Sequence, residues 1–339
     1  MTQAPRIGSL PSGPLDLISD VAGVTVGHCT LAEGPLQTGV TVLKPHGGDP
    51  YRDRVPAAAM VLNGFGKSIG LVQVDELGVL ETPIALSNTF AVGALAQAQI
   101  RHCVAANPQS GRRLPTVNPL VFECNDGYLN DIQALAVGEA HYQLALDAAA
   151  ADFAQGSVGA GRGMSSFGLK GGIGSASRVA GGYTVGALVL SNFGRPEQFT
   201  WAGRPLGAAL ATRLAEAAEP EKGSIIMLLA SDAPLDSRQL RRLALRAGAG
   251  LARTGSVFGH GSGDIALAFS TAYTVPQDPV RAMPALALLH DARLDALFQA
   301  AADATEQAIV NALWHATSVT GRDGHRRQAL TELLSDISS

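Results

Sequence analysis

Several segments of the chain place hydroxyl, carboxylate or amide side chains at the ends of predicted strands. In the first, Gly223 and Ser224 stand directly before residues 225–230, six apolar residues in succession that predict a buried strand. A strand end holds a serine hydroxyl more rigidly than a loop does, as a nucleophile requires. Taken alone, the same residues also fit an ordinary turn before a strand. Gly223–Ser224 is therefore a candidate nucleophile junction that other segments must support.

A second segment, residues 259–270, places a hydroxyl and a carboxylate two positions apart where a strand begins. In an extended chain residues i and i+2 share a face, so Ser262 and Asp264 are expected to point the same way. A carboxylate beside a hydroxyl can orient it or hold the ammonium group of a substrate. A glycine-rich turn with a solvated aspartate is the alternative for this segment.

Two further polar residues follow apolar strands. Asn192 ends the strand predicted for residues 183–191, and its amide N–H could serve an oxyanion. A plain turn residue at a strand end is the alternative. Glu123 follows the apolar residues 120–122 and is expected to project from a strand end into a cleft.

The familiar cofactor motifs are incomplete. Residues 64–68 resemble the tail of a phosphate-binding loop, but the first glycine of that motif would fall on Val61. We expect a turn with an exposed lysine there. The dinucleotide fingerprint fails too, because Ser177 stands where residues 172–174 would need a third glycine or alanine. No cofactor is therefore expected.

The histidines and cysteines show no metal-ligand spacing, so no metal is expected and the histidines are interpreted as structural. These residues are His28, His260, His315, Cys29, Cys103 and Cys124. An odd number of cysteines also argues against a disulfide framework and favours a reducing cytoplasm. Neither a signal peptide nor a transmembrane span is visible in the sequence, so no membrane partner is expected.

The remaining segments must supply the elements that position these groups. Residues 17–28 and 39–44 predict an antiparallel strand pair around a turn at 31–37, and further strands are predicted at 57–63, 183–191, 225–230 and 265–270. Helices are predicted at 89–103, 131–153, 206–218, 237–249 and 294–316, while 156–177 is a glycine-dense segment. No linker separates two cores. We therefore expect one domain of sheets packed together with helices outside.

Composition agrees with a buried α/β protein. Of the 339 residues, 46% are hydrophobic and only 16% are charged, which excludes general disorder. The formal net charge is -4 and no basic run is interleaved with aromatics, so nucleic acid is not an expected partner.

Taken together, these segments resemble the family of L-aminopeptidase/D-Ala-esterase/amidases and β-peptidyl aminopeptidases, which are self-processing serine N-terminal-nucleophile hydrolases. The resemblance covers nearly the whole chain, and its strength lies in the order of the motifs. They fall at residues 18–28, 62–67, 81–89, 125–131, 159–164, 167–174, 192–194, 223–224, 261–264 and 320–325.

The resemblance implies a four-layer α/β/β/α sandwich. It implies cleavage of the Gly223–Ser224 bond, which divides the single hydrolase domain 1–339 into chains 1–223 and 224–339. Ser224 would then be both the nucleophile and a new N-terminus. The implied substrates are short peptides, amino acid amides and esters, with D- and β-amino acid compounds included. A homo-oligomer, a tetramer, is also implied.

The family pattern also assigns roles to other positions of this sequence. It places an oxyanion-binding amide at Asn192 and a second serine and an acid at Ser262 and Asp264. Well-known members carry glutamate where this chain has Asp264, whose side chain is shorter. Glu123 and Tyr128 match positions near the amino end and the acyl pocket of the substrate.

The chemistry of such a site is self-consistent. A serine hydroxyl becomes nucleophilic when a base takes its proton, and a free α-amine with a pKa of about 7.7–8.0 can do so near neutrality. Before cleavage that amine is an amide nitrogen, so the precursor would need Ser262 and Asp264 instead. Two alternatives stay open: an acyltransferase of the ornithine acetyltransferase type, whose nucleophile is threonine, and a non-catalytic scaffold that binds small molecules.

Overall fold

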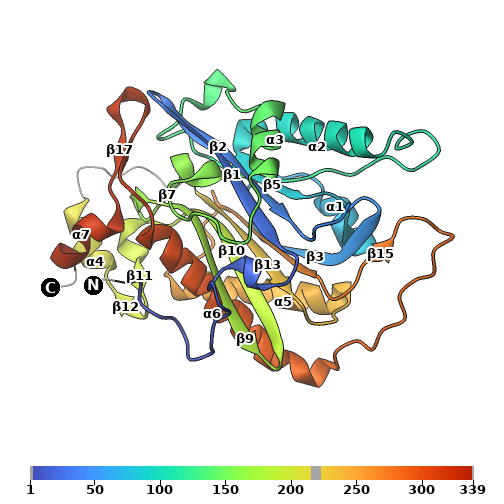
Figure 1. Ribbon diagram of the computed structural model, residues 1–339. Helices are drawn as coiled ribbons and strands as arrows, with labels where there is room; N and C mark the ends of the chain where they lie inside the picture. Colours follow the sequence, from blue (N-terminus) through green and yellow to red (C-terminus); the bar gives the residue numbers. More distant parts are fainter. Residues whose placement is uncertain (1–2, 215–222, 338–339) are drawn as a thin grey trace.

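In the computed structural model, which describes residues 3–214 and 223–337, two β-sheets lie face to face and helices cover their outer faces (Figure 1). The first sheet has the strand order β1-β2-β5-β6. Its strands are β1 (Thr25–Glu33), β2 (Leu36–Lys44), β5 (Ile84–Asn88) and β6 (Leu120–Cys124).

The second sheet has the order β15-β3-β14-β13-β10-β9, with β4 paired to β3. Its strands are β3 (Asp53–Gly64), β4 (Val79–Leu80), β9 (Gly172–Ala180), β10 (Tyr183–Asn192), β13 (Ser224–Ser231), β14 (Gly263–Ser270) and β15 (Val275–Pro276). Strands β13 and β14 run parallel, and their outer neighbours β10 and β3 run antiparallel to them.

Helices α2 (Val92–Ala106) and α3 (Glu139–Asp147) lie over the first sheet, and α5 (Ser237–Arg253) and α6 (Leu294–Trp314) lie over the second. The other helices are α1 (Leu71–Leu77), α4 (Gly207–Arg213) and α7 (Leu330–Ile337). Three two-stranded ribbons complete the fold: β7 (Ser165–Ser166) with β8 (Leu169–Lys170), β11 (Thr200–Trp201) with β12 (Arg204–Pro205), and β16 (Val319–Thr320) with β17 (Arg326–Arg327). The four-layer α/β/β/α sandwich is therefore confirmed.

Strand β13 shows why the apolar run after Ser224 has no polar alternation. Ile226 and Leu228 belong to the core between the two sheets, whereas Ile225 and Met227 belong to the core under α5 and α6. A strand buried on both faces must be apolar at every position. Since side chains alternate along a strand, Ser224 lies in the row of Ile226 and Leu228, on the side of the first sheet.

Each helical layer approaches its sheet most closely at a glycine. A Cβ atom at Gly27 of β1 would collide with the carbonyl oxygen of Ala145 in α3, and one at Gly174 of β9 would collide with that of Ala308 in α6. Both contacts are with backbone, which cannot turn aside as a flexible side chain can. These glycines therefore set the distance between helix and sheet.

The structure confirms the predicted antiparallel pair but moves its start. Strand β1 begins only at Thr25, because residues 18–20 form a short 3-10 turn in which Asp20 accepts the backbone N–H groups of Leu15 and Leu17. The strands also run through most of the segment interpreted as a turn, since β1 ends at Glu33 and β2 begins at Leu36.

Three other predictions need correction. The helix predicted for residues 131–153 is wrong over most of its length: Leu135 has a φ of 49°, α3 spans only Glu139–Asp147, and Ala150 exchanges backbone hydrogen bonds with Val26. The glycine-dense segment 156–177 contains most of strand β9, which the sequence analysis missed. Helix α4 ends at Arg213, and residues 215–218 of the predicted helix 206–218 lie outside the described residues.

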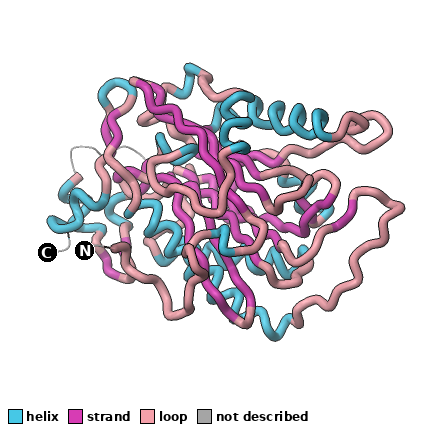
Figure 2. Tube along the Cα trace, in the orientation of Figure 1, coloured by secondary structure: helices cyan, strands magenta, loops and turns pink. Residues whose placement is uncertain are grey.

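The chain between the second sheet and α6 is a long loop. A long stretch without helix or strand joins β15 to the turn before α6 (Figure 2). Among the described residues, no helix is both long and apolar enough to cross a membrane.

Candidate active site

Four strand ends from the two sheets meet at one place. Asn192 at the end of β10 pairs with Ser224 at the start of β13, and Ser224 pairs with Gly263 at the start of β14. Directly opposed residues of neighbouring antiparallel strands project from the same face of a sheet, so Asn192 and Ser224 share a face. Glu123 lies near the end of β6 in the first sheet, and β6 is in contact with β13. Residues from four separate segments of the sequence thus converge here.

The hydroxyl of Ser224 is held by backbone. Its side chain is nearly buried, and Oγ accepts the N–H of Gly263 at 3.1 Å. A Cβ atom at position 263 would lie 2.9 Å from the carbonyl oxygen of Phe65 and 3.0 Å from Ser224 Oγ, so only glycine fits without displacing them. The contact therefore depends on a backbone approach that no other residue type allows.

Ser262 and Asp264 form the pair expected from their spacing. Both side chains are buried, and Ser262 Oγ donates to Asp264 Oδ1 at 2.6 Å. The prediction that they share a face is confirmed. The two residues flank Gly263, whose N–H contacts Ser224, so the pair lies beside the candidate nucleophile.

The peptide bond before Ser224 is held tightly on its N-terminal side. A Cβ atom at Gly223 would collide with the carbonyl oxygen of Asn192 and would lie 2.6 Å from Phe193 Cα. Only glycine can bring the chain this close to the end of β10. The Gly223–Ser224 bond is therefore held against the strand that ends at Asn192.

The amide of Asn192 is oriented by two backbone groups. Its Oδ1 accepts the N–H of Ser165 at 2.8 Å, and its Nδ2 donates to the carbonyl oxygen of Asn125 at 3.1 Å. An amide nitrogen carries two hydrogens, and no described residue accepts the second one. Asn192 thus has one donor available next to Ser224.

Glu123 holds the loop that follows β3. One carboxylate oxygen accepts the backbone N–H of Lys67 at 2.8 Å, and the other accepts the hydroxyl of Thr89. The carboxylate is only 2% exposed, so Glu123 projects from its strand as predicted, but into a network rather than an open cleft. Sequence reasoning missed both partners, although each lies within a motif of the family resemblance. Lys67 itself is exposed, as expected for that turn.

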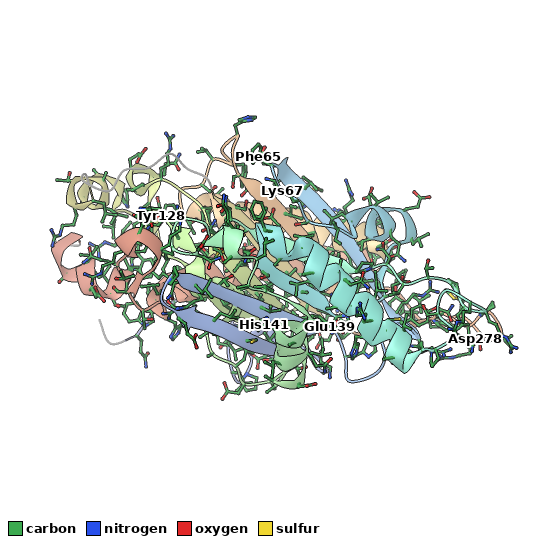
Figure 3. All side chains as sticks on the ribbon, turned by 90° about the horizontal axis from the view of Figure 1, so that it is seen from above. Phe65, Lys67, Tyr128, Glu139, His141 and Asp278 are labelled. Atoms are coloured by element: carbon green, nitrogen blue, oxygen red, sulfur yellow. The ribbon has the colours of Figure 1, made fainter. Side chains whose placement is uncertain are left out.

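Tyr128 lies on the same side of the molecule as Phe65 and Lys67 (Figure 3). Its ring stacks on that of His325 with 4.6 Å between centroids, and the guanidinium carbon of Arg327 lies 3.6 Å from the Tyr128 centroid. His325 Nδ1 also bonds to the backbone oxygen of Tyr128 at 2.9 Å. The C-terminal segment therefore fixes Tyr128, a contact that no local pattern predicts.

Three carboxylates gather around one buried thiol beneath Ser224. Cys124 Sγ donates to the carbonyl oxygen of Ser224 at 3.3 Å. Burial raises the pKa of the Cys124 thiol well above its usual value, and the charges of Glu123, Asp264 and Asp126 raise it further. Burial also raises the pKa of Asp126 to about 7. The site is thus rich in acidic groups, as a site for an ammonium group would be.

Of the histidines singled out in the sequence, His260 lies in the loop before Ser262 with its ring 6.0 Å from that of Phe65, whereas His28 lies in β1. His28 bonds to Thr41 Oγ1 at 2.9 Å and to the carbonyl oxygen of Ala154 at 3.0 Å, and burial lowers its pKa to about 4. Its role is structural, as interpreted from the sequence. Among residues 3–214 and 223–337, no three His, Cys, Asp or Glu side chains are arranged to hold a metal ion.

The chain is similar to known proteins over most of its length. The family model for peptidase family S58 matches residues 16–327. A β-peptidyl aminopeptidase, BapA of Sphingosinicella microcystinivorans, is 38% identical to the chain over 94% of it and 86% of the relative.

Two solved structures are equally similar in fold. The β-aminopeptidase of a Burkholderia species has a TM-score of 0.90 and 42% identity, covering 98% of this chain and 96% of that one. The L-aminopeptidase D-Ala-esterase/amidase of Ochrobactrum anthropi, described as a variant of the Ntn hydrolase fold, has a TM-score of 0.90 and 35% identity with the same coverage. The chain belongs to peptidase family S58.

Proposed function

We propose that this aminopeptidase cleaves its own Gly223–Ser224 bond and then uses Ser224 as an N-terminal nucleophile. The observation that carries the proposal is the position of the bond. A glycine with no room for a side chain precedes a serine at the first position of a central strand, between Asn192 and Gly263. The single domain 1–339 would thereby become chains 1–223 and 224–339.

Maturation begins with attack of Ser224 Oγ on the carbonyl carbon of Gly223. The hydroxyl proton passes to the departing amide nitrogen with help from the Ser262–Asp264 pair, the C–N bond breaks, and an ester links Gly223 to Ser224 Oγ. Water then opens that ester, which leaves a carboxylate on Gly223 and a free α-amine and hydroxyl on Ser224. The amine is the base that the precursor lacks.

In turnover the α-amine of Ser224 takes the proton from its own Oγ, which attacks the substrate carbonyl. Asn192 donates its available N–H to the oxyanion that develops. The proton then passes from the α-amine to the departing amine or alcohol as its bond to the acyl carbon breaks, and the acyl group remains on Ser224 Oγ as an ester until water releases it as the acid. The relatives matched are named as peptidases and amidases, and no feature of the site favours transfer of the acyl group to an amine instead.

The acidic groups favour substrates with a free, protonated amino group. Glu123 and Asp264 lie next to the neutral hydroxyls of Ser224 and Ser262. Tyr128 is inferred to line the pocket for the acyl part of the substrate. We infer that peptides, amino acid amides and esters are cleaved, with β- and D-amino acid compounds included, as the names of the relatives suggest.

The setting of the enzyme is inferred from the family resemblance and from chemistry. We infer that the enzyme forms a homo-oligomer, namely a tetramer. The three cysteines Cys29, Cys103 and Cys124 are all unpaired thiols, which fits a reducing cytoplasm.

Replacement of the nucleophile tests the proposal. Wild-type protein should give two polypeptides on a denaturing gel, with N-termini at Met1 and Ser224 by Edman sequencing, and Ser224→Ala should remain one chain without activity. Ser256→Ala, a hydroxyl removed outside the site, is the matched control and should be cut and active. A single Met1 terminus in fully active wild-type protein would contradict the mechanism.

Acetylation of the substrate tests the amine requirement. An ammonium bound to a buried carboxylate leaves that carboxylate unpaired when its charge is removed, which costs about 3–5 kcal/mol. N-acetylation of a good peptide substrate should therefore lower kcat/KM by a factor of about 10²–10⁴. Equal kcat/KM for the free and acetylated peptides would assign Glu123 and Asp264 to another role and leave a general amidase.

A further inference from the structure

A cavity of about 560 Å³ lies at the opposite end of β5 from the candidate active site. Thr82 and Pro83, just before β5, line it, whereas Asn88 at the far end of β5 pairs with Cys124 in the active site. Residues of α2 and α3 form its walls together with the loop after β2, in the region where Figure 1 shows these helices over the sheet. Its volume is within the range of small-molecule sites.

The walls of this cavity carry more acid than base. Asp49, Glu81 and Asp147 line it, against Lys44 alone among the lysines and arginines. In the described part of the chain none of these three carboxylates forms an ion pair. The charge of the cavity is therefore available to a cationic ligand.

Glu81 has one carboxylate oxygen unused. Its side chain is only 7% exposed, and Oε1 accepts the backbone N–H of Asn118 at 2.6 Å. The second oxygen accepts no hydrogen bond from any residue that the structure describes. This oxygen is not among the fully buried side-chain atoms of the described residues, so a donor in the cavity can reach it. By contrast, both oxygens of Asp49 are occupied by Tyr51 and Asn107.

The neighbouring Thr82 also lines the cavity, and its hydroxyl oxygen is fully buried. It is 2% exposed, and among the described residues its hydroxyl has no hydrogen-bond partner. An ammonium group has three N–H donors, so it can serve Glu81 and a rotated Thr82 hydroxyl together. The two adjacent residues therefore match a primary amine better than an anion or a neutral group.

The rest of the cavity suits an apolar body. Pro50, Leu146 and Cys103 contribute apolar surface. Burial raises the pKa of the Cys103 thiol to about 11, so the thiol is neutral at pH 7. The wall is also rigid, because Gln99 of α2 donates to the carbonyl oxygens of Pro83 and Leu120 at 2.7 and 3.1 Å.

We propose that this cavity is a second ligand site, which binds a small molecule with a primary ammonium group and an apolar body. The ammonium lies on Glu81 and Thr82, and the apolar body lies against Pro50 and Leu146. The site is separate from the catalytic groups proposed above, and its occupation does not require cleavage of the chain.

Alkylation of Cys103 tests the proposal, since this thiol lines the cavity. The probe is 2-phenylethylamine, which has no bond for the enzyme to cut, and the readout is the rate of carbamidomethylation by iodoacetamide from peptide masses. At ten times its Kd the amine should slow alkylation of Cys103 about tenfold, because the fraction of protein without ligand is divided by 1 + [L]/Kd. Cys29, which is partly exposed on β1 and does not line the cavity, is the internal control and should not change.

Three comparisons make the result specific. 2-Phenylethanol, which lacks the charge, should not protect Cys103. Glu81→Gln, which keeps an acceptor for the N–H of Asn118, should abolish protection by the amine, whereas Glu123→Gln should leave it unchanged. Equal protection by the alcohol, protection that survives Glu81→Gln, or no protection by the amine in the millimolar range would overturn the proposal. Should Glu81→Gln fail to fold, the comparison of amine and alcohol on the wild type decides.

Discussion

The amide of Asn192 is already oriented for the oxyanion role proposed above. Ser165 and Asn125 fix both ends of the amide, so the donor that remains needs no reorganisation to reach an oxyanion. A donor of this kind acts on charge that develops only in the transition state. Its loss should therefore affect the rate of the chemical step more than substrate binding.

We predict that Asn192→Ala lowers kcat by a factor of about 10²–10³ and changes KM little. The measurement requires processed enzyme, so the extent of cleavage must be determined first on a denaturing gel. Asn130→Ala is the matched control. It removes another buried amide, which bonds to Asp126, and should lower stability without lowering kcat. An unchanged kcat in mature Asn192→Ala would remove Asn192 from the site.

At the level of single residues, the sequence predicts contacts that depend on local geometry. Ser262 and Asp264 follow from the two-residue period of a strand, and their bond of 2.6 Å agrees. The contact of Glu123 with the N–H of Lys67 joins a strand of the first sheet to a loop of the second, and the stack of Tyr128 on His325 joins distant segments. Such contacts depend on how the layers assemble, which no local period encodes.

Among the elements, the strands that are buried on both faces were predicted close to their true length. Residues 225–230 and 265–270 gave β13 and β14 because burial on both faces leaves a continuous apolar run. The helix expected over residues 131–153 failed because periodicity continued through alanines, while the chain there leaves α3 to pair with Val26. Strand β9 was not predicted because its glycines interrupt the pattern of a strand. One of them, Gly174, has no room for a side chain beside α6.

The contact of α6 with Gly174 gives a prediction at this scale. Gly174→Ala should lower the free energy of unfolding by about 1–3 kcal/mol or more, because the added methyl group meets the backbone of Ala308. Gly93→Ala is the matched control. No atom lies within 4 Å of a Cβ there, and the residue is within α2, so that variant should be more stable by up to about 1 kcal/mol. Urea unfolding of both variants in the uncut Ser224→Ala background measures the difference, and equal midpoints would contradict this account of the helix layer.

For the whole molecule, the order of strands in the second sheet decides what the proposed cleavage does. Strands β13 and β14 belong to the segment after Ser224, yet they lie between β3 and β10 from the segment before it. If either segment folded alone, two strands that are paired on both sides in the intact sheet would each lose a neighbour and become exposed edges. The two chains are therefore expected to stay together as one folded body after the bond is cut.

This interleaving predicts a difference in refolding. Uncut Ser224→Ala should recover its far-UV circular dichroism after urea at a rate that does not depend on protein concentration, because each protomer folds from a single chain before it assembles. The processed enzyme must first bring two chains together, so its yield should rise with concentration and be lower at each dilution. Light scattering and far-UV circular dichroism after dilution measure both. Equal, concentration-independent yields would show that the chains fold separately and contradict the interlocked sheet.

The same strand order also determines how the stability of the cut enzyme should be measured. Once the chain is cut, the connectivity that guided β13 between its neighbours no longer exists, and thermal damage becomes a one-way event. The working lifetime is then set by the height of the unfolding barrier rather than by the equilibrium between folded and unfolded states. Inactivation half-lives at a fixed temperature, rather than melting midpoints, would be the appropriate scale for ranking variants of the mature protein.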